Sequence, residues 1–275
     1  MTRPDISIVW QLYWSLRREL WENRSILVAP AAVVVLIIIG SAISVFRLPG
    51  RVNALDPSQH HEVIEQPYEF AALLLMFITL VIAFYYCLEA FQSERRDRSI
   101  LFWKSLPVSD HTTVIAKASV ALLILPLVTF AATVVTHVFM LLLGSAWRVV
   151  PVLPMWTGLF FHLVAGHGLW YAPFYGWLLL VSAWARRAPL LWATLPLLAL
   201  GLVERIAFNT SHFASLLVSR FAGAPAEARV ADPMSMTSLA PMQLLNSPGF
   251  WLGLAFYVAC LAAAAYLRRE RGPVS

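Results

Sequence analysis

The chain has 275 residues, of which 60% are hydrophobic and 13% are charged, and its formal net charge is +5 at pH 7. Soluble domains carry about 25% charged residues, so this composition, with a mean hydropathy of +0.71, predicts an integral membrane protein. The composition excludes an intrinsically disordered chain and a disulfide-rich secreted domain. The two cysteines, Cys87 and Cys260, both lie in apolar stretches, which argues against a thiolate metal site.

The first 25 residues are predicted to hold an amphipathic helix over residues 6–24. Apolar residues recur at spacings of three and four, while charged residues take another face; the apolar set is Ile6, Val9, Trp10, Tyr13, Leu16 and Leu20. Three tryptophans suit the level of the lipid headgroups. The segment is too long for the n-region of a signal peptide. We therefore expect a helix that lies in the inner membrane interface.

Residues 26–275 are predicted to form one six-span domain of an all-α membrane protein. A bilayer core of about 30 Å needs about 20 apolar helical residues, and six stretches qualify: 26–46, 70–91, 118–143, 159–184, 190–208 and 251–267. The fourth is interrupted by Pro173 and three glycines. A membrane β-barrel is excluded, because these runs lack the alternation that a barrel wall requires.

The basic residues predict the orientation. Fourteen of the 20 lie on one side of the six spans: Arg3, Arg17, Arg18, Arg24, Arg95, Arg96, Arg98, Lys104, Lys117, Arg186, Arg187, Arg268, Arg269 and Arg271. The positive-inside rule then places both termini in the cytoplasm. Because topology accounts for the positive charge, we expect no nucleic-acid partner.

The outer loop before the second span contains His61-Glu62-Val63-Ile64-Glu65. This resembles the zinc-protease pattern H-E-x-x-H, in which two histidines share one helix face, but Glu65 stands in place of the second histidine. We therefore interpret the segment as a solvated polar loop and expect no metal site.

The most informative segment is the cytoplasmic loop 92–117. Charged residues come first, a short apolar group follows, and Pro107 ends any helix that begins near Ser93. Ser109 or Asp110 can cap the next helix. The pattern predicts a short helix beyond the membrane that exposes aromatic residues, and such exposed patches often mark a docking surface.

The residues from Glu94 to Phe102, followed by Ser105-Leu106-Pro107-Val108-Ser109 and Lys117, resemble the signature between the second and third spans of ABC-2-type permeases. These are the membrane subunits of ATP-binding-cassette exporters. The layout is similar too, with an interfacial N-terminal helix, six spans and a longer outer segment between spans five and six.

The resemblance implies that the chain forms half of a substrate pathway in the bacterial cytoplasmic membrane, completed by a second permease chain. It implies two copies of a separate ATPase, which carry the ATP and Mg. The short cytoplasmic helix is then a coupling helix that docks on the ATPase through Glu94, Arg95, Arg96, Asp97, Arg98, Ile100, Leu101, Phe102, Trp103, Lys104 and Leu106.

The chain has no phosphate-binding loop of its own. That loop needs the pattern G-x-x-x-x-G-K-[ST], because backbone amides and a lysine must surround the phosphates. The two lysines, Lys104 and Lys117, are preceded by Phe-Trp and Ile-Ala. We therefore expect no enzymatic activity and no cofactor in this chain.

Several polar residues lie in or beside the spans, where charge is costly and often functional. They are candidates for the substrate pathway or a gate: Glu89, His137, His162, His167 and Glu204. The alternative is structural, with Glu89 pairing with Arg95 or Arg96 and the histidines forming interhelical hydrogen bonds.

The outer segment 209–248 begins with an amphipathic stretch that includes Phe213, Leu217, Arg220 and Phe221. It can lie on or dip into the outer leaflet, and the resemblance implies short re-entrant helices here. Two other functions stay open: a membrane-embedded metalloenzyme built on His61, Glu62 and Glu65, and a membrane anchor that recruits an ATPase without transport.

Overall fold

The computed structural model describes residues 8–45, 60–96, 109–143, 152–221 and 247–270. Every regular element in these ranges is helical. Six helices are long and apolar enough to cross a membrane: Ser25–Ser44, Glu65–Arg96, Asp110–Leu143, Val152–Trp170, Pro189–Phe208 and Pro248–Glu270. The prediction of an all-helical protein with six candidate spans is therefore confirmed.

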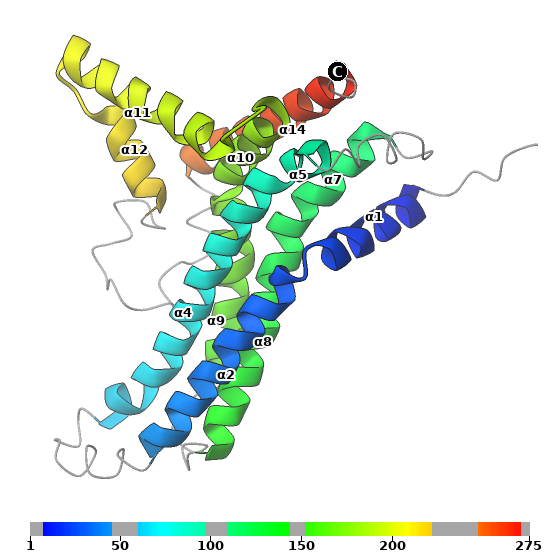
Figure 1. Ribbon diagram of the computed structural model, residues 1–275. Helices are drawn as coiled ribbons and strands as arrows, with labels where there is room; N and C mark the ends of the chain where they lie inside the picture. The colour runs from blue at the N-terminus through cyan, green and yellow to red at the C-terminus, as the bar shows by residue number, and fades with distance from the viewer. Residues whose placement is uncertain (1–7, 46–59, 97–108, 144–151, 222–246, 271–275) are drawn as a thin grey trace, which may run out of the picture.

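Four long helical segments lie side by side in a bundle (Figure 1). They are α2 (Ser25–Val45), α4 (His60–Glu89), the continuous segment α7 (Asp110–Ser119), η2 (Val120–Ile124) and α8 (Leu125–Leu143), and the segment α9 (Val152–Phe161), η4 (His162–Trp170) and α10 (Ala172–Trp184). Large and small apolar side chains from these segments form the main core, including Tyr86, Tyr175 and Leu179.

The helix of the second span begins earlier than its predicted apolar stretch, because polar residues continue the helix beyond that stretch. Residues 60–69 form the first turns of α4, so the prediction of a polar loop there is wrong. Helix α7 begins at Asp110 after Ser109, whose hydroxyl accepts a hydrogen bond from the amide of Thr112. This cap agrees with the sequence analysis.

The fourth predicted span, 159–184, is divided. Its apolar helix begins at Val152, continues as the π-helix η4, and ends at a turn before α10. Pro173 lies at the start of α10, where a missing backbone N–H costs least. Single-turn π segments are frequent at functional sites, and here η2 and η4 pack against each other.

Helix α14 (Pro248–Glu270) packs mainly against α10. The contact is close because Gly176 has no side chain: a Cβ atom there would lie 2.7 Å from the Tyr257 ring and 3.2 Å from its Cα. A small residue at such a crossing lets two helix backbones approach.

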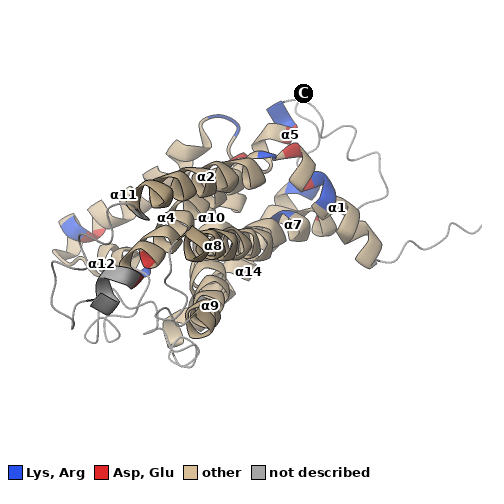
Figure 2. Ribbon diagram, turned by 90° about the horizontal axis from the view of Figure 1, so that it is seen from below, with Lys and Arg blue, Asp and Glu red and all other residues tan. Residues whose placement is uncertain are grey.

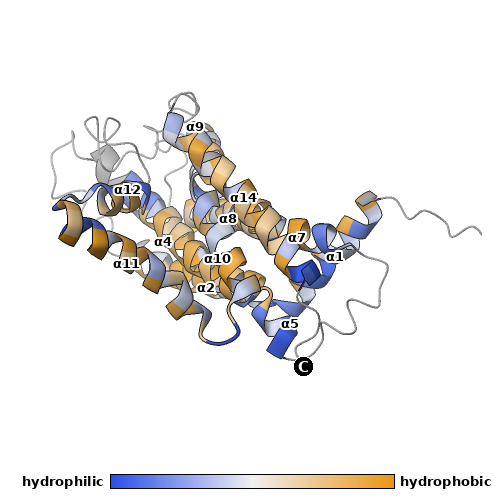
Figure 3. Ribbon diagram, turned by 90° about the horizontal axis from the view of Figure 1, so that it is seen from above, coloured by the Kyte–Doolittle hydropathy of each residue, from blue (hydrophilic) through white to orange (hydrophobic). Residues whose placement is uncertain are grey.

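Helices α11 (Pro189–Phe208) and α12 (His212–Phe221) stand apart from the bundle. Helix α11 runs away from it, and α12 returns from the far end of α11 toward the bundle (Figure 1). Most of the α11 ribbon has hydrophobic colours (Figure 3), and most of its large apolar side chains are exposed, among them Leu190, Leu198 and Ile206. A helix that is apolar on every side needs lipid or another protein around it.

Helix α1 (Ile8–Glu22) turns away from α2 and packs on α7. One face exposes apolar and aromatic side chains, namely Val9, Trp10, Tyr13, Trp14 and Trp21. The opposite face packs on α7, where Glu19 meets Lys117, and approaches α5 (Gln92–Arg96) through Arg18. Charged residues gather in this region, which we call the charged end, whereas the bundle helices carry few (Figure 2).

Candidate functional site

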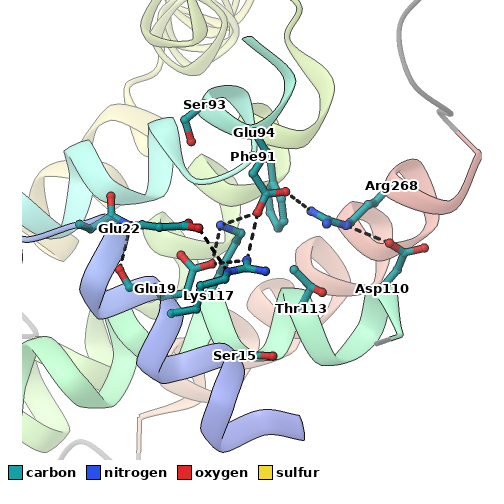
Figure 4. Close-up of polar contacts among 12 residues, drawn as sticks. Ser15, Glu19, Glu22, Phe91, Ser93, Glu94, Asp110, Thr113, Lys117 and Arg268 are labelled. Atoms are coloured by element: carbon teal, nitrogen blue, oxygen red, sulfur yellow. Dashed lines mark hydrogen bonds and ion pairs between the residues drawn. The ribbon is translucent and has the colours of Figure 1, made fainter. Parts of the chain in front are cut away.

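The charged end contains a cluster of six ionic side chains from four helices, four of them buried (Figure 4). Three are cations and three are anions: Arg18 and Glu19 of α1, Glu94 of α5, Asp110 and Lys117 of α7, and Arg268 of α14. We call these residues the ion-pair cluster. Its formal charges cancel, which burial in a low-dielectric interior requires.

Lys117 lies at the centre of the ion-pair cluster and is 2% exposed. Its Nζ is 2.8 Å from the Glu19 carboxylate and 3.1 Å from the Glu94 carboxylate. The other oxygen of Glu19 accepts a hydrogen bond of 2.9 Å from the hydroxyl of Tyr86. Lys117 of α7 thus joins α1 to α5, and the Tyr86 hydroxyl ties α1 to α4.

Glu94 is the second shared group, with 4% of its side chain exposed. Besides Lys117, it contacts Arg18 at 3.3 Å and Arg268 at 2.8 Å. Arg268 also donates to Asp110 through Nε at 2.9 Å. The ring of Phe91 lies 5.5 Å from the charged groups of both Lys117 and Arg268, within the range of cation–π attraction.

Arg95, next to Glu94, binds a different helix. Its guanidinium donates to the carbonyls of Ala183 at 2.8 Å and Ala185 at 3.0 Å, and also to that of Ser182. These carbonyls end α10, where the helix dipole is negative. The hydroxyl of Ser182 in turn accepts from the amide of Phe91 at 3.0 Å. Arg95 and Phe91 therefore fix α5 to the end of α10.

The edge of the ion-pair cluster is partly exposed to solvent. Glu22 lies 3.6 Å from Arg18, and partial burial raises its pKa although the Arg18 guanidinium opposes the shift. Arg96 and Glu89 approach to 3.9 Å at the surface. One of the two pairings expected for Glu89 is therefore present, while Arg95 is bound to α10 instead.

The docking residues expected between positions 97 and 108 lie outside the described residues; they are Asp97, Arg98, Ile100, Leu101, Phe102, Trp103, Lys104 and Leu106. The structure shows the two ends of this segment. Glu94 and Arg95 precede it, Asp110 follows it, and all three are bound to other helices. Ser93 lies inside α5 rather than capping it, and its hydroxyl donates to the carbonyl of Glu89.

Two of the candidate pathway histidines form interhelical hydrogen bonds. Nε2 of His137 is 3.0 Å from the carbonyl of Tyr68, and its Nδ1 accepts from Trp156 at 3.3 Å. Nε2 of His167 is 2.9 Å from the carbonyl of Met76. Because a carbonyl can only accept, each of these histidines carries a proton on Nε2. Nδ1 of His162 is buried without a hydrogen-bond partner.

Glu204, the last candidate, caps a helix. Its carboxylate accepts from the amides of His212 at 2.7 Å and Phe213 at 2.8 Å, and from the hydroxyl of Thr210 at 2.9 Å. Carboxylates at a helix N-terminus satisfy free amides and favour the helix dipole. Glu204 therefore fixes the turn between α11 and α12.

Within the described residues, no group of three or more His, Cys, Asp and Glu side chains could hold a metal ion. The pairs that Glu19 forms with Lys117, and Arg268 with Glu94 and Asp110, were not predicted from the sequence. The only signal was that all of these charges lie on the same predicted side of the membrane.

The family model described as "ABC-2 family transporter protein" matches residues 20–187, which is more than half of the chain. The matched region contains Glu94, Asp110 and Lys117, together with α5 and α10. No curated protein and no solved structure matches the chain significantly.

Proposed function

Because the chain belongs to the ABC-2 family of transporter proteins, we propose that it is the permease subunit of an ABC exporter in the bacterial cytoplasmic membrane. Two such chains, identical or related, would form the substrate pathway. Two copies of a separate ATPase would bind and hydrolyse ATP and would dock on residues 94–106. Both termini of the permease would lie in the cytoplasm.

One observation carries this proposal: both ends of the segment 97–108 are bound to helices that are distant in the sequence. Glu94 joins the segment to α1, α7 and α14, Arg95 joins it to α10, and Asp110 pairs with Arg268. A force applied to the segment would therefore reach four helices at once. A loop that only linked two spans would not need these buried contacts.

The proposed mechanism divides the docking residues into two groups. Glu94 and Arg95 hold the root of the segment, because their side chains bind this chain's own helices. The aromatic and aliphatic residues Ile100, Phe102 and Trp103 would enter a groove on the ATPase. When the ATPase subunits close on ATP, the ion-pair cluster would shift as a unit and change the packing of the bundle.

Helix α1 has a second proposed role as an interfacial support. Its exposed face is lined by Val9, Trp10, Tyr13 and Trp14, with Arg17 beside them. Aromatic side chains favour the headgroup region, and the basic residue favours anionic lipids. Its buried face pairs with Lys117 through Glu19. The helix would thus fix the ion-pair cluster at the membrane surface.

The proposal is tested by co-expressing the tagged permease with its ATPase, purifying the complex and measuring ATP hydrolysis in proteoliposomes. We expect the ATPase to co-purify and the variant Glu94→Gln to uncouple its turnover from the permease. The matched control is Glu270→Gln, which removes one exposed carboxylate from α14. Co-purification with no ATP-dependent movement of any substrate would instead favour a membrane anchor.

A further inference from the structure

Arg220, at the end of α12, is a buried cation that no carboxylate of the described residues neutralises. Its side chain belongs to the buried set, with 8% of the residue exposed. Nη1 donates to the carbonyl of Gly249 at 2.8 Å, but Nε and Nη2 are buried and have no hydrogen-bond partner. Among the described residues, no carboxylate forms an ion pair with it. An uncompensated buried charge is costly and calls for an explanation.

The surroundings hold this guanidinium in one place. It lies over the ring of Trp170, with Cζ 4.3 Å from the ring centroid, and the Trp170 indole donates to the carbonyl of Arg220 at 2.9 Å. Gly253 of α14 leaves the necessary space, because a Cβ atom there would lie 1.9 Å from Nη2. A glycine and an aromatic face thus accommodate a guanidinium that forms no ion pair within the described part of the chain.

The neighbouring side chains are apolar and aromatic. The ring of Phe221 lies 4.4 Å from that of Phe174 and 6.1 Å from that of Phe84. Phe250 is buried and packs against Trp170. The two free N–H groups of Arg220 therefore lie beside a surface that favours hydrocarbon. Hydrogen bonds from Trp170 and Tyr171 to its last carbonyls and from Arg220 to Gly249 tie the end of α12 to the bundle, while Glu204 holds its first turn to α11.

From this combination we infer that Arg220 binds the anionic headgroup of an amphiphile whose apolar chain lies along these aromatic rings. Nε and Nη2 can donate two parallel hydrogen bonds to a phosphate, as arginine does in bidentate contacts. A shift of α12 would open this edge to the ligand. The inference rests on the proposed transport function, because it names the class of substrate: an amphiphile with a phosphate headgroup.

The first test measures binding to the isolated permease in phosphatidylcholine nanodiscs. Dodecyl phosphate is titrated below its critical micelle concentration, with zwitterionic dodecylphosphocholine as the charge control, and the thermal unfolding midpoint is followed. We expect dodecyl phosphate alone to raise the midpoint. Arg220→Met should raise the apparent Kd about tenfold or more, because the paired charge is lost. The control Arg205→Met removes an exposed arginine from α11 and should bind as the wild type does.

The same measurement separates a binding role from a structural one. Without ligand, Arg220→Met should melt at the wild-type temperature or above, because it removes an unpaired buried charge while keeping an apolar side chain. Gly253→Ala keeps the charge but displaces the guanidinium, so it should weaken binding as well. Equal shifts by dodecyl phosphate in the wild type, Arg220→Met and Gly253→Ala would overturn the inference.

Two further arms identify the source of the ligand and keep the two proposals apart. If the ligand is a resident membrane lipid, phosphatidylglycerol should bind to the permease but leave the ATP turnover of the complex unchanged. That result would overturn the assignment of the ligand as a substrate. A substrate should stimulate turnover in the wild type and not in Arg220→Met. Because binding is measured without the ATPase, its failure would leave the docking proposal intact, and a failure of docking would leave the binding result intact.

Discussion

The ammonium of Lys117 and the carboxylate of Glu94 lie 3.1 Å apart, and both side chains are almost completely buried. The pair joins the helix that enters the third span to the helix that leaves the second. Each partner has further contacts, Lys117 with Glu19 and Glu94 with Arg18 and Arg268. The contact is therefore the centre of a network rather than an isolated ion pair.

Lys117→Met should destabilise the protein by about 3–5 kcal/mol, because it leaves Glu19 and Glu94 buried with less neutralisation. The measurement is unfolding in detergent by circular dichroism. Arg269→Met removes an exposed cation from α14 and should change stability by no more than about 0.5 kcal/mol. Equal stability of the two variants would show that water or a local rearrangement of the protein stabilises the carboxylates of Glu19 and Glu94 without Lys117.

A double-mutant cycle tests whether Lys117 and Glu19 act together. Glu19→Gln alone should destabilise the protein, since Tyr86 and Lys117 then face a neutral amide. The double variant with Lys117→Met should cost less than the sum of the two single variants. Each single change leaves the opposite charge of the pair behind, whereas the double variant removes both charges. Additive effects would contradict a direct coupling.

Phe102→Ala combined with Trp103→Ala should abolish association with the ATPase and its stimulated turnover, while the permease still inserts and dimerises. Buried aromatic side chains dominate interfaces and cost about 2 kcal/mol or more when truncated. Arg98→Ala should weaken association in a salt-dependent way. Leu127→Ala, an exposed change on α8, serves as the control. Normal yield and turnover of the double variant would place the docking surface elsewhere.

Cysteines introduced at positions 60 and 230 should react with membrane-impermeant maleimides in intact cells, whereas one at position 187 should not. The expectation follows from the split of basic residues across the predicted spans. Background labelling should be low because native Cys87 and Cys260 are buried. Protection of both outer positions would contradict the six-span topology.

His137 and His162 provide a matched pair of intramembrane histidines. His137→Leu should cost about 0.6 kcal/mol, the average measured for interhelical hydrogen bonds in a membrane, and no more than about 1.7 kcal/mol for each bond lost, because it loses contacts to Tyr68 and Trp156. His162→Leu removes a buried nitrogen that has no partner and should be neutral or stabilising. Thermal unfolding in detergent compares them. A larger loss for His162→Leu would reverse the structural assignment.

The helical architecture could be predicted because spans are set by length and apolar composition, and Ser109 was identifiable as a cap from its position after Pro107. The start of α4 could not be predicted, because residues 60–69 are mostly polar and form a helix only as an extension of the apolar span that follows them. Neither π-helix has a distinct sequence pattern. The two segments, which are far apart in the sequence, contact each other only in the folded bundle.

The sequence shows the charged residues of the ion-pair cluster but not which of them pair. Tyr86 and Glu19 are 67 positions apart, and Arg268 and Glu94 are 174 apart, so only the folded bundle brings them together. Arg220 was interpreted as part of an amphipathic stretch, although its guanidinium lies against Trp170 and Gly253. Docking through Phe102 and Trp103 stays a prediction.

The position of Arg268 in the chain also sets an order of assembly. It is made 174 residues after its partner Glu94, which at about 5–20 residues per second is roughly 10–35 seconds of synthesis. During that interval Glu94 and Lys117 can already meet, but Asp110 has no Arg268. Insertion of α14 then completes the neutralisation. Helix α14 thus supplies the last cation of the charged end, and a chain that stalls before Arg268 leaves Asp110 and Glu94 without that partner.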